Sequence, residues 1–210
     1  MLHGLVLSGA PVRDYDKRLT LLTMEEGKTT VWAAGAKKPG SPYMAACRSF
    51  VFGTFYVGNG RSGYNLHSVK VINYFEEIAL DLEHACCGAY LLELADFVSQ
   101  EKLPAKDAVN LLYLSLKAIL NPHISDALVR RIFELRMLLL NGEYTESPPR
   151  EASEACCYAW RYILTAPLPK LYTFTLTEEV LAELGSNIDL LLRETVPVQL
   201  RSLRLLESLS

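Results

Sequence analysis

The chain has 210 residues and a net charge of −3, half of its residues are hydrophobic, and its mean hydropathy is slightly positive. Such a composition supplies a buried core and is unlike that of a disordered chain. The apolar runs, such as Met137–Leu140, are far shorter than the roughly 18 residues of a membrane helix. No secretion signal is expected, because the first residues lack a basic segment ahead of an apolar one.

Charge is distributed unevenly along the chain. Residues 1–73 hold nine Lys or Arg against four Asp or Glu, a net charge of +5, whereas the remainder carries −8. A basic segment joined to an acidic one indicates an anionic partner, such as nucleic acid, for the first part. Small β domains are often mildly basic for no such reason, so charge alone leaves both interpretations open.

The five cysteines lie at positions 47, 86, 87, 156 and 157, without C-x-x-C spacing. Two vicinal pairs are poor disulfide partners and poor zinc ligands. We therefore expect reduced thiols in a cytoplasm, with the two vicinal pairs serving as small core residues of helices.

Five strand-like segments occur in the first part of the chain: Leu2–Ser8, Arg18–Thr23, Lys28–Ala33, Arg48–Val57 and Tyr64–Ile72. Gly27 allows the positive φ of a tight hairpin, and Gly53 predicts a bulge or bend. We expect Phe50 and Phe52 in the core. Five strands in about 70 residues predict an OB-type β-barrel over residues 1–73.

From Phe75 onward apolar residues recur at spacings of three and four, as in helices. Helices are predicted over about 75–98, 104–120, 126–141, 154–164, 178–193 and 200–209, with an extended segment at 171–176. Ser125 and Thr177 are predicted N-caps, and Gly142 is the expected end of the third helix. The fold class is thus α+β, in which the barrel is followed by a helical domain over residues 74–210.

No sequence motif indicates an enzyme. The string Gly58-x-Gly-x-x-Gly63 matches a dinucleotide-binding fingerprint, but it lies between two strands and contains Asn59-Gly60, a hairpin signal. His84, beside acidic residues, is better explained as a helix-surface residue. We expect neither catalytic residues nor a cofactor.

Basic and aromatic residues alternate through the barrel segments. OB barrels bind single strands by combining cations along the phosphate backbone with aromatic platforms for the bases. Lys37 and Lys38, in a loop rich in Gly and Pro, are the best candidates for phosphate contacts, and Trp32 fits either a core position or a platform. The predicted DNA-binding residues are Lys17, Arg18, Lys28, Lys37, Lys38, Tyr43, Arg48 and Arg61.

A second candidate surface is the segment Arg130–Arg136, in which arginines alternate with apolar residues. One interpretation is a core helix with a solvated basic edge. The other is a groove for an acidic peptide with an apolar end.

Eight short segments occur in an order and spacing typical of one known family: Gly4–Leu7, Asp16–Lys17, Leu21–Thr23, Glu26–Lys28, Gly35–Lys38, Tyr90–Leu94, Phe133–Arg136 and Arg161–Leu168. On these segments the chain resembles the bacterial RecO family of recombination mediators over nearly its full length. The resemblance implies an OB domain that binds single- and double-stranded DNA, a helical domain, and a cytoplasmic, nucleoid-associated protein without enzymatic activity.

The resemblance also implies partners. Proteins of this family anneal complementary strands and, with RecR, help to load RecA onto DNA coated by single-stranded DNA-binding protein (SSB). Their helical domain captures the acidic, Phe-ending tail of SSB, a role that falls to Arg131 here, with Phe133 and Leu135 as neighbouring walls. The alternative is an adaptor that binds RecR or the SSB tail with weak or no direct affinity for DNA.

Two departures from the family pattern matter. Many relatives carry a four-cysteine zinc module between the third and fourth helices, but the short loop 143–153 has no cysteine and Cys156-Cys157 do not match the motif, so no zinc is expected. A lysine common before the Gly-Ala of the third strand is Ala34 here. Lys37 and Lys38 are therefore left to supply the positive charge beside the third strand. The loss of one lysine predicts weaker DNA binding than in relatives.

Overall fold

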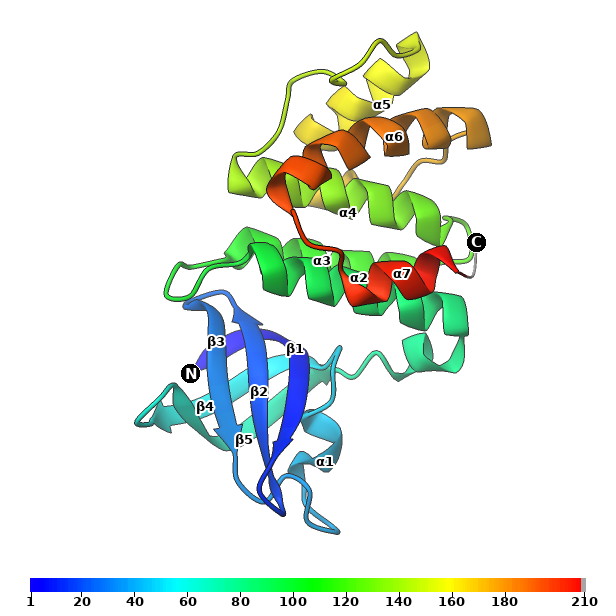
Figure 1. The fold of residues 1–210 in the computed structure, drawn as a ribbon. Helices are drawn as coiled ribbons and strands as arrows, with labels where there is room; N and C mark the ends of the chain where they lie inside the picture. The colour runs from blue at the N-terminus through cyan, green and yellow to red at the C-terminus, as the bar shows by residue number, and fades with distance from the viewer. Residues whose placement is uncertain (209–210) are drawn as a thin grey trace. The chain divides into compact units, whose positions relative to one another are not determined.

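The computed structural model describes residues 1–208, and the chain divides into two compact units (Figure 1). Unit 1 comprises Met1–Ala79 and Leu92–Val109, and unit 2 comprises Leu80–Leu91 and the chain from Asn110 onward. The division falls inside helix α2 (Leu82–Val98).

Five strands form a closed barrel in unit 1: β1 (Leu2–Val12), β2 (Asp16–Thr23), β3 (Gly27–Ala33), β4 (Phe52–Asn59) and β5 (Tyr64–Asn73). Their order around the barrel is β1-β2-β3-β5-β4 (Figure 1). The β3–β5 pair is parallel, and the other neighbours are antiparallel. This is the strand order of an OB barrel, so the predicted fold class is confirmed.

The sequence predicts a bulge or bend at Gly53, and the structure has a bulge opposite this residue whose extra residue, Ile72, lies on β5. The β4–β5 register shifts between Phe52 and Gly53, and a Cβ on Gly53 would lie 2.6 Å from a backbone oxygen of β5. From Val51 onward the alternation is uninterrupted, and the inward positions are Val51, Gly53 and Phe55, each buried. The expectation that Phe50 and Phe52 form the core is wrong: both are half-buried, and Phe50 has a φ of 74° just before the strand.

Turn and loop chemistry is partly as predicted. Gly27 has a φ of +61° in the β2–β3 hairpin, as expected. Between β3 and β4 the sequence predicts only a loop, whereas the structure adds the single-turn helix α1 (Tyr43–Ala46), which has no side-chain N-cap. A helix of four residues without a cap leaves no periodic signal in the sequence.

The helical part of the chain contains η1 (Glu76–Leu80), α2, α3 (Lys106–Ile119), α4 (Asp126–Asn141), α5 (Glu154–Thr165), η2 (Leu168–Lys170), α6 (Glu178–Thr195) and α7 (Arg201–Glu207). The predicted caps are confirmed: Ser125 and Thr177 accept hydrogen bonds from the third N–H of their helices, and Gly142 ends α4 with a φ of 78°. The extended segment predicted at 171–176 is wrong, since a turn follows η2 there. The last helix ends at Glu207, and residue 209 lies outside the described residues.

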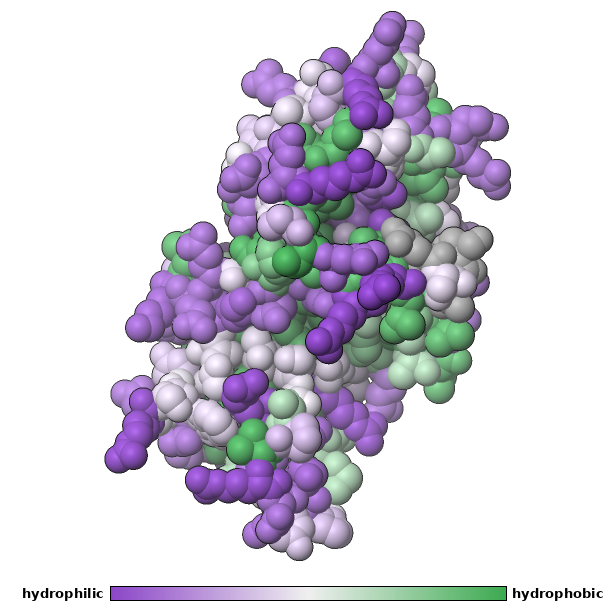
Figure 2. Space-filling view, in the orientation of Figure 1, coloured by the Kyte–Doolittle hydropathy of each residue, from purple (hydrophilic) through white to green (hydrophobic). Residues whose placement is uncertain are grey.

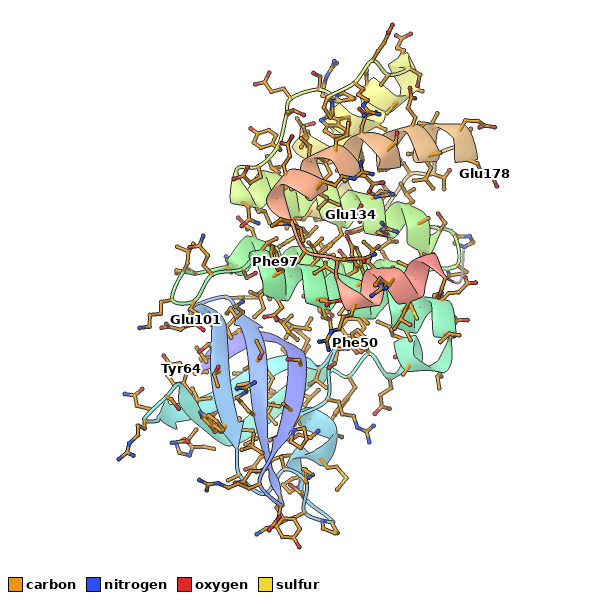
Figure 3. All side chains as sticks on the ribbon, in the orientation of Figure 1. Phe50, Tyr64, Phe97, Glu101, Glu134 and Glu178 are labelled. Carbon is orange, nitrogen blue, oxygen red and sulfur yellow. The ribbon has the colours of Figure 1, made fainter. Side chains whose placement is uncertain are left out.

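A fully buried carboxylate organises unit 2. Glu134 on α4 (Figure 3) accepts hydrogen bonds from the Tyr90 hydroxyl at 2.6 Å and from Arg130 and Arg131 at 2.8 Å each. Arg131 Nη1 also donates to Asp189 of α6 at 2.6 Å. Burial alone would raise the pKa of Glu134, but the charges of Arg131 and Arg130 outweigh it and hold this pKa below its usual value.

Replacing Glu134 by Ala should lower the free energy of unfolding by about 3–5 kcal/mol, because two arginines would lose their buried counter-charge. The pKa of Glu134 is lower in the folded chain than its ordinary 4.5. Its stabilisation is therefore complete above about pH 4.5 and is lost as pH falls through the lower, folded-state pKa.

Urea denaturation of both chains at pH 7 measures this difference. The exposed Glu146→Ala variant serves as the control and should change the free energy of unfolding by less than about 0.5 kcal/mol. If Glu134→Ala lowered the free energy of unfolding by as little as the control variant, the role assigned to this carboxylate would be contradicted.

Candidate nucleic-acid interface

A groove crosses the outer face of β3, with Trp32 at its centre. The strand register places Trp32 opposite Arg18 of β2 and beside Asn65 of β5, so the three side chains form one row across the sheet. The groove has a volume of about 550 Å³, and Arg13 from the β1–β2 loop and Arg61 from the β4–β5 loop line it. In OB barrels this face and these two loops bind oligonucleotides. We call this feature the Trp32 groove.

The Trp32 side chain is held in place by the β4–β5 loop. Its Nε1–H donates a hydrogen bond to the Ser62 carbonyl oxygen at 2.7 Å, and the residue is half-buried. The sequence left open whether Trp32 is a core residue or a platform. The structure places it on the outer face, with part of its ring accessible from the groove.

A second hollow adjoins the Trp32 groove and shares Arg13 and Asp16 with it. Lys38 lines it, with its Nζ 5.9 Å from the centre of the exposed Tyr15 ring. The loop is fixed because the Asp16 carboxylate accepts a hydrogen bond from the Gly35 N–H at 2.8 Å. Figure 2 shows strongly hydrophilic side chains at the edges of the barrel, with more neutral ones between them.

The structure brings part of the predicted cation set together. Arg18, Lys37, Lys38 and Arg61 are exposed. Arg18 lies opposite Trp32 in the β2–β3 register, and Arg61 lines the Trp32 groove. Lys37 is tied to the same loop region, since its N–H donates to the Tyr15 carbonyl oxygen at 2.8 Å.

Three other predicted DNA-binding residues do not line the Trp32 groove, and their side chains form hydrogen bonds within the fold. Lys17 Nζ donates to the carbonyl oxygen of Cys47, which ends α1, at 3.3 Å. Lys28, at the opposite end of the β2–β3 hairpin, donates to the Asp96 carbonyl oxygen at 2.6 Å and pairs with its carboxylate at 3.4 Å. Tyr43 donates to the His67 carbonyl oxygen at 2.6 Å.

Arg48 is exposed just after α1 and lines neither the Trp32 groove nor the hollow beside it. Sequence reasoning left out Arg13, which the structure places in both cavities. The available signal was its position in the turn between the first two strands, since that turn flanks the ligand face of an OB barrel.

The peptide site expected on α4 has a different environment from a surface groove. Phe133 and Leu135 are fully buried and contribute to the core of unit 2 instead of to a wall, because the inner side of α4 packs against neighbouring helices. The Arg131 side chain is 16% exposed and is paired with Glu134 and Asp189. Of the two sequence interpretations, these positions match the core helix with a basic edge.

The thiols and carboxylates do not fit a zinc module. Among residues 1–208, no group of three or more His, Cys, Asp or Glu is placed to hold a metal ion. Burial raises the pKa of the Cys156 thiol to about 11. Separately, no helix in the described part of the chain is long and apolar enough to cross a membrane.

The fold and the groove define a class: an OB-type barrel whose Trp32 groove is lined by two arginines and an aspartate, followed by a helical domain. The chain matches the family model of the recombination protein O N terminal over residues 2–75 and that of the recombination protein O C terminal over residues 79–147. It therefore belongs to the RecO family, and the predicted resemblance is confirmed.

Relatives named DNA repair protein RecO support this assignment. The protein of Shouchella clausii (strain KSM-K16) is 31% identical over 154 residues, which cover 73% of this chain and 58% of the relative. That of Exiguobacterium sibiricum is 37% identical over 136 residues, covering 65% and 54%. The chain thus spans little more than half the length of these two relatives. A relative from Clostridium kluyveri is 23% identical over 238 aligned positions, covering 99% and 93%.

Elemental analysis of the purified protein should find no stoichiometric zinc, and EDTA should leave its thermal unfolding midpoint unchanged. The expectation follows from the absence of cysteine in the loop 143–153 and from the absence of a metal-binding cluster among residues 1–208. One bound zinc per chain would overturn it.

Proposed function

We propose that this protein is a non-enzymatic, DNA-binding recombination mediator that acts in DNA repair by annealing complementary strands. The observation that supports this proposal best is the Trp32 groove, where an aromatic ring lies between the cations of two loops, Arg13 and Arg61. A single strand offers the matching chemistry, since its phosphates are anionic and its bases have apolar faces that stack on aromatic rings.

In this mechanism the strand runs along the outer face of β3. Lys38, Arg13 and Arg61 contact phosphates and release their counterions, while Trp32 and Tyr15 stack against bases. Stacking leaves the pairing edges of the bases free. Neutralising the phosphates also reduces the repulsion between two strands, so that pairing becomes the favoured outcome without any bond chemistry.

Family membership supports the proposed partners. We assign to this chain binding of single- and double-stranded DNA, cooperation with RecR, and, through RecR, loading of RecA onto SSB-coated single strands in the bacterial cytoplasm. For the SSB tail we propose Arg131 as the contact, with Asp189 as its internal competitor. The Asp189 side chain is 37% exposed, so an incoming carboxylate would reach the guanidinium by displacing it.

The alternative function is an adaptor that binds RecR or the SSB tail with weak or no affinity for DNA. The internal engagement of Lys17 and Lys28 favours it, because these cations are not available to phosphates. Salt dependence separates the two functions, since only phosphate neutralisation gives a steep loss of affinity as salt rises.

Replacing Lys37 and Lys38 together by Ala should weaken oligonucleotide binding for all sequences alike. Loss of two phosphate contacts on a single strand should reduce the slope of log affinity against log salt by about 1.4. Fluorescence anisotropy at several salt concentrations measures both quantities. The matched control is the double variant Lys117→Ala and Lys170→Ala, which removes two exposed charges from unit 2. Failure of the wild-type chain to bind at low salt would favour the adaptor.

Replacing Arg131 by Ala should weaken binding of an acidic peptide that ends in Phe, whereas Asp189→Asn should strengthen it by removing the competing carboxylate. Both variants should keep wild-type affinity for DNA. Isothermal titration with the peptide, beside a thermal melt of each variant, tests this assignment. Unchanged peptide affinity in a folded Arg131→Ala variant would place the tail site elsewhere.

A further inference from the structure

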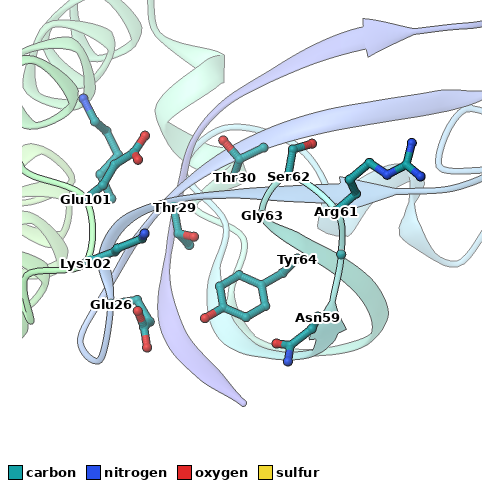
Figure 4. A pocket seen from close by; sticks show the side chains of 12 residues that line it. Glu26, Thr29, Thr30, Asn59, Arg61, Ser62, Gly63, Tyr64, Glu101 and Lys102 are labelled. Atoms are coloured by element: carbon teal, nitrogen blue, oxygen red, sulfur yellow. The ribbon is translucent and has the colours of Figure 1, made fainter.

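A second cavity, of about 570 Å³ (Figure 4), adjoins the Trp32 groove at the β4–β5 loop, whose residues Arg61 and Ser62 line both. It exists because β3 and β5 pair only at Val31–Tyr64 and Trp32–Asn65 and then separate. Toward the start of β3 the backbone of Glu101 forms isolated bridges to Gly27 and Lys28 instead. Between these two points a hollow remains, which we call the Tyr64 pocket.

The ridge between the groove and the pocket is the tight β4–β5 loop. Gly63 has a φ of +95°, and a Cβ there would lie 2.4 Å from the Thr30 carbonyl oxygen, so a residue with a side chain would strain this close approach. Arg61 and Ser62 line both cavities. A strand that leaves the Trp32 groove over this loop therefore passes Arg61 and enters the Tyr64 pocket.

The polar groups of the Tyr64 pocket are of four kinds, one of which is the carboxamide of Asn59. Cations come from Arg61 and Lys102, whereas Lys28 is already paired with Asp96. The carboxylates of Glu26 and Glu101 form no ion pair with any residue in the range 1–208. Hydroxyl groups come from the threonines of β3 and from Tyr64 (Figure 4).

These carboxylates separate the pocket chemically from a simple phosphate site. Two acids repel a phosphate, but they accept hydrogen bonds from the exocyclic amino group of a base, which offers two N–H donors. The Tyr64 ring is half-buried and packs against the barrel core, which offers a fixed surface for stacking. The volume of about 570 Å³ lies within the range of small-ligand sites and accommodates one nucleotide.

We propose that the Tyr64 pocket holds one nucleobase of the bound strand and selects bases that carry an exocyclic amino group over thymine. The inference rests on the proposed function, because the strand must first occupy the Trp32 groove. Cytosine donates from its N4 amino group to a carboxylate of Glu26 or Glu101. Thymine has a single donor on this edge, N3–H, which lies between the O2 and O4 carbonyl oxygens, and both of these oxygens repel a carboxylate. Arg61 holds the phosphate at the ridge.

The test compares oligo(dC) with oligo(dT), both about 15 nucleotides long and so within the site sizes of OB domains. The two have the same number of phosphates, and anisotropy at pH 7 and low salt gives both affinities. The wild-type chain should bind oligo(dC) roughly tenfold more tightly than oligo(dT), the discrimination typical of a good base contact.

The double variant Glu26→Gln and Glu101→Gln should reduce this preference to less than about twofold, because an amide both donates and accepts hydrogen bonds. The matched control, Glu76→Gln with Glu77→Gln, changes the charge equally at exposed positions outside the pocket. It should raise both affinities slightly and keep their ratio.

Three results of these titrations would contradict the base pocket. Equal affinities for the two oligonucleotides, with steep salt dependence, would overturn the base pocket and leave DNA binding in place. A preference that survives in the double variant would assign selectivity to another site and overturn the pocket as well. Absence of binding to both oligonucleotides would refute the proposed function and this inference together.

Discussion

The parallel pairing of β3 with β5 closes the barrel, and it extends over only two residue pairs, Val31–Tyr64 and Trp32–Asn65. On one side of this closure lies the Trp32 groove, and on the other side the strands separate to leave the Tyr64 pocket. The β4–β5 loop folds over the junction, held by the hydrogen bond from Trp32 to the Ser62 carbonyl oxygen. A longer β3–β5 ladder would fill the pocket with paired backbone. The short closure thus positions both cavities.

Whether a cation serves the fold or remains available to a ligand depends on the acceptors within its reach. Lys17 and Lys28 find backbone carbonyl oxygens at Cys47 and Asp96, and Arg131 finds two carboxylates. These side chains contribute to local structure, and their charges are largely offset. Arg61 sits on a loop that contains no acidic residue and keeps its charge at the groove. This distinction explains why the net charge of the first 73 residues overstates the cationic surface available to DNA.

Local chemistry made much of the fold predictable, and nonlocal contacts account for what was missed. The caps Ser125 and Thr177 and the turn at Gly27 depend on neighbouring residues, so their sequence signals are direct. Alternation along β4 is regular, but which of its two faces is buried depends on how the strand pairs with β1 and β5, so that Phe55 and not Phe52 lies in the core. Asp189, the partner of Arg131, lies 58 positions away. Candidate phosphate contacts were predictable as residue types, but the groove that unites some of them requires the barrel closure.

In the proposed annealing mechanism the two cavities have different roles. A base stacked on Trp32 exposes its pairing edge, so a complementary strand can meet it while the protein holds the phosphates. A base in the Tyr64 pocket presents that edge to Glu26 or Glu101 and is not free to pair. The proposal therefore has pairing begin over the Trp32 groove, with the base in the pocket released as the duplex grows past Arg61. A weak, single-base pocket is compatible with this order, whereas a row of such pockets would oppose it.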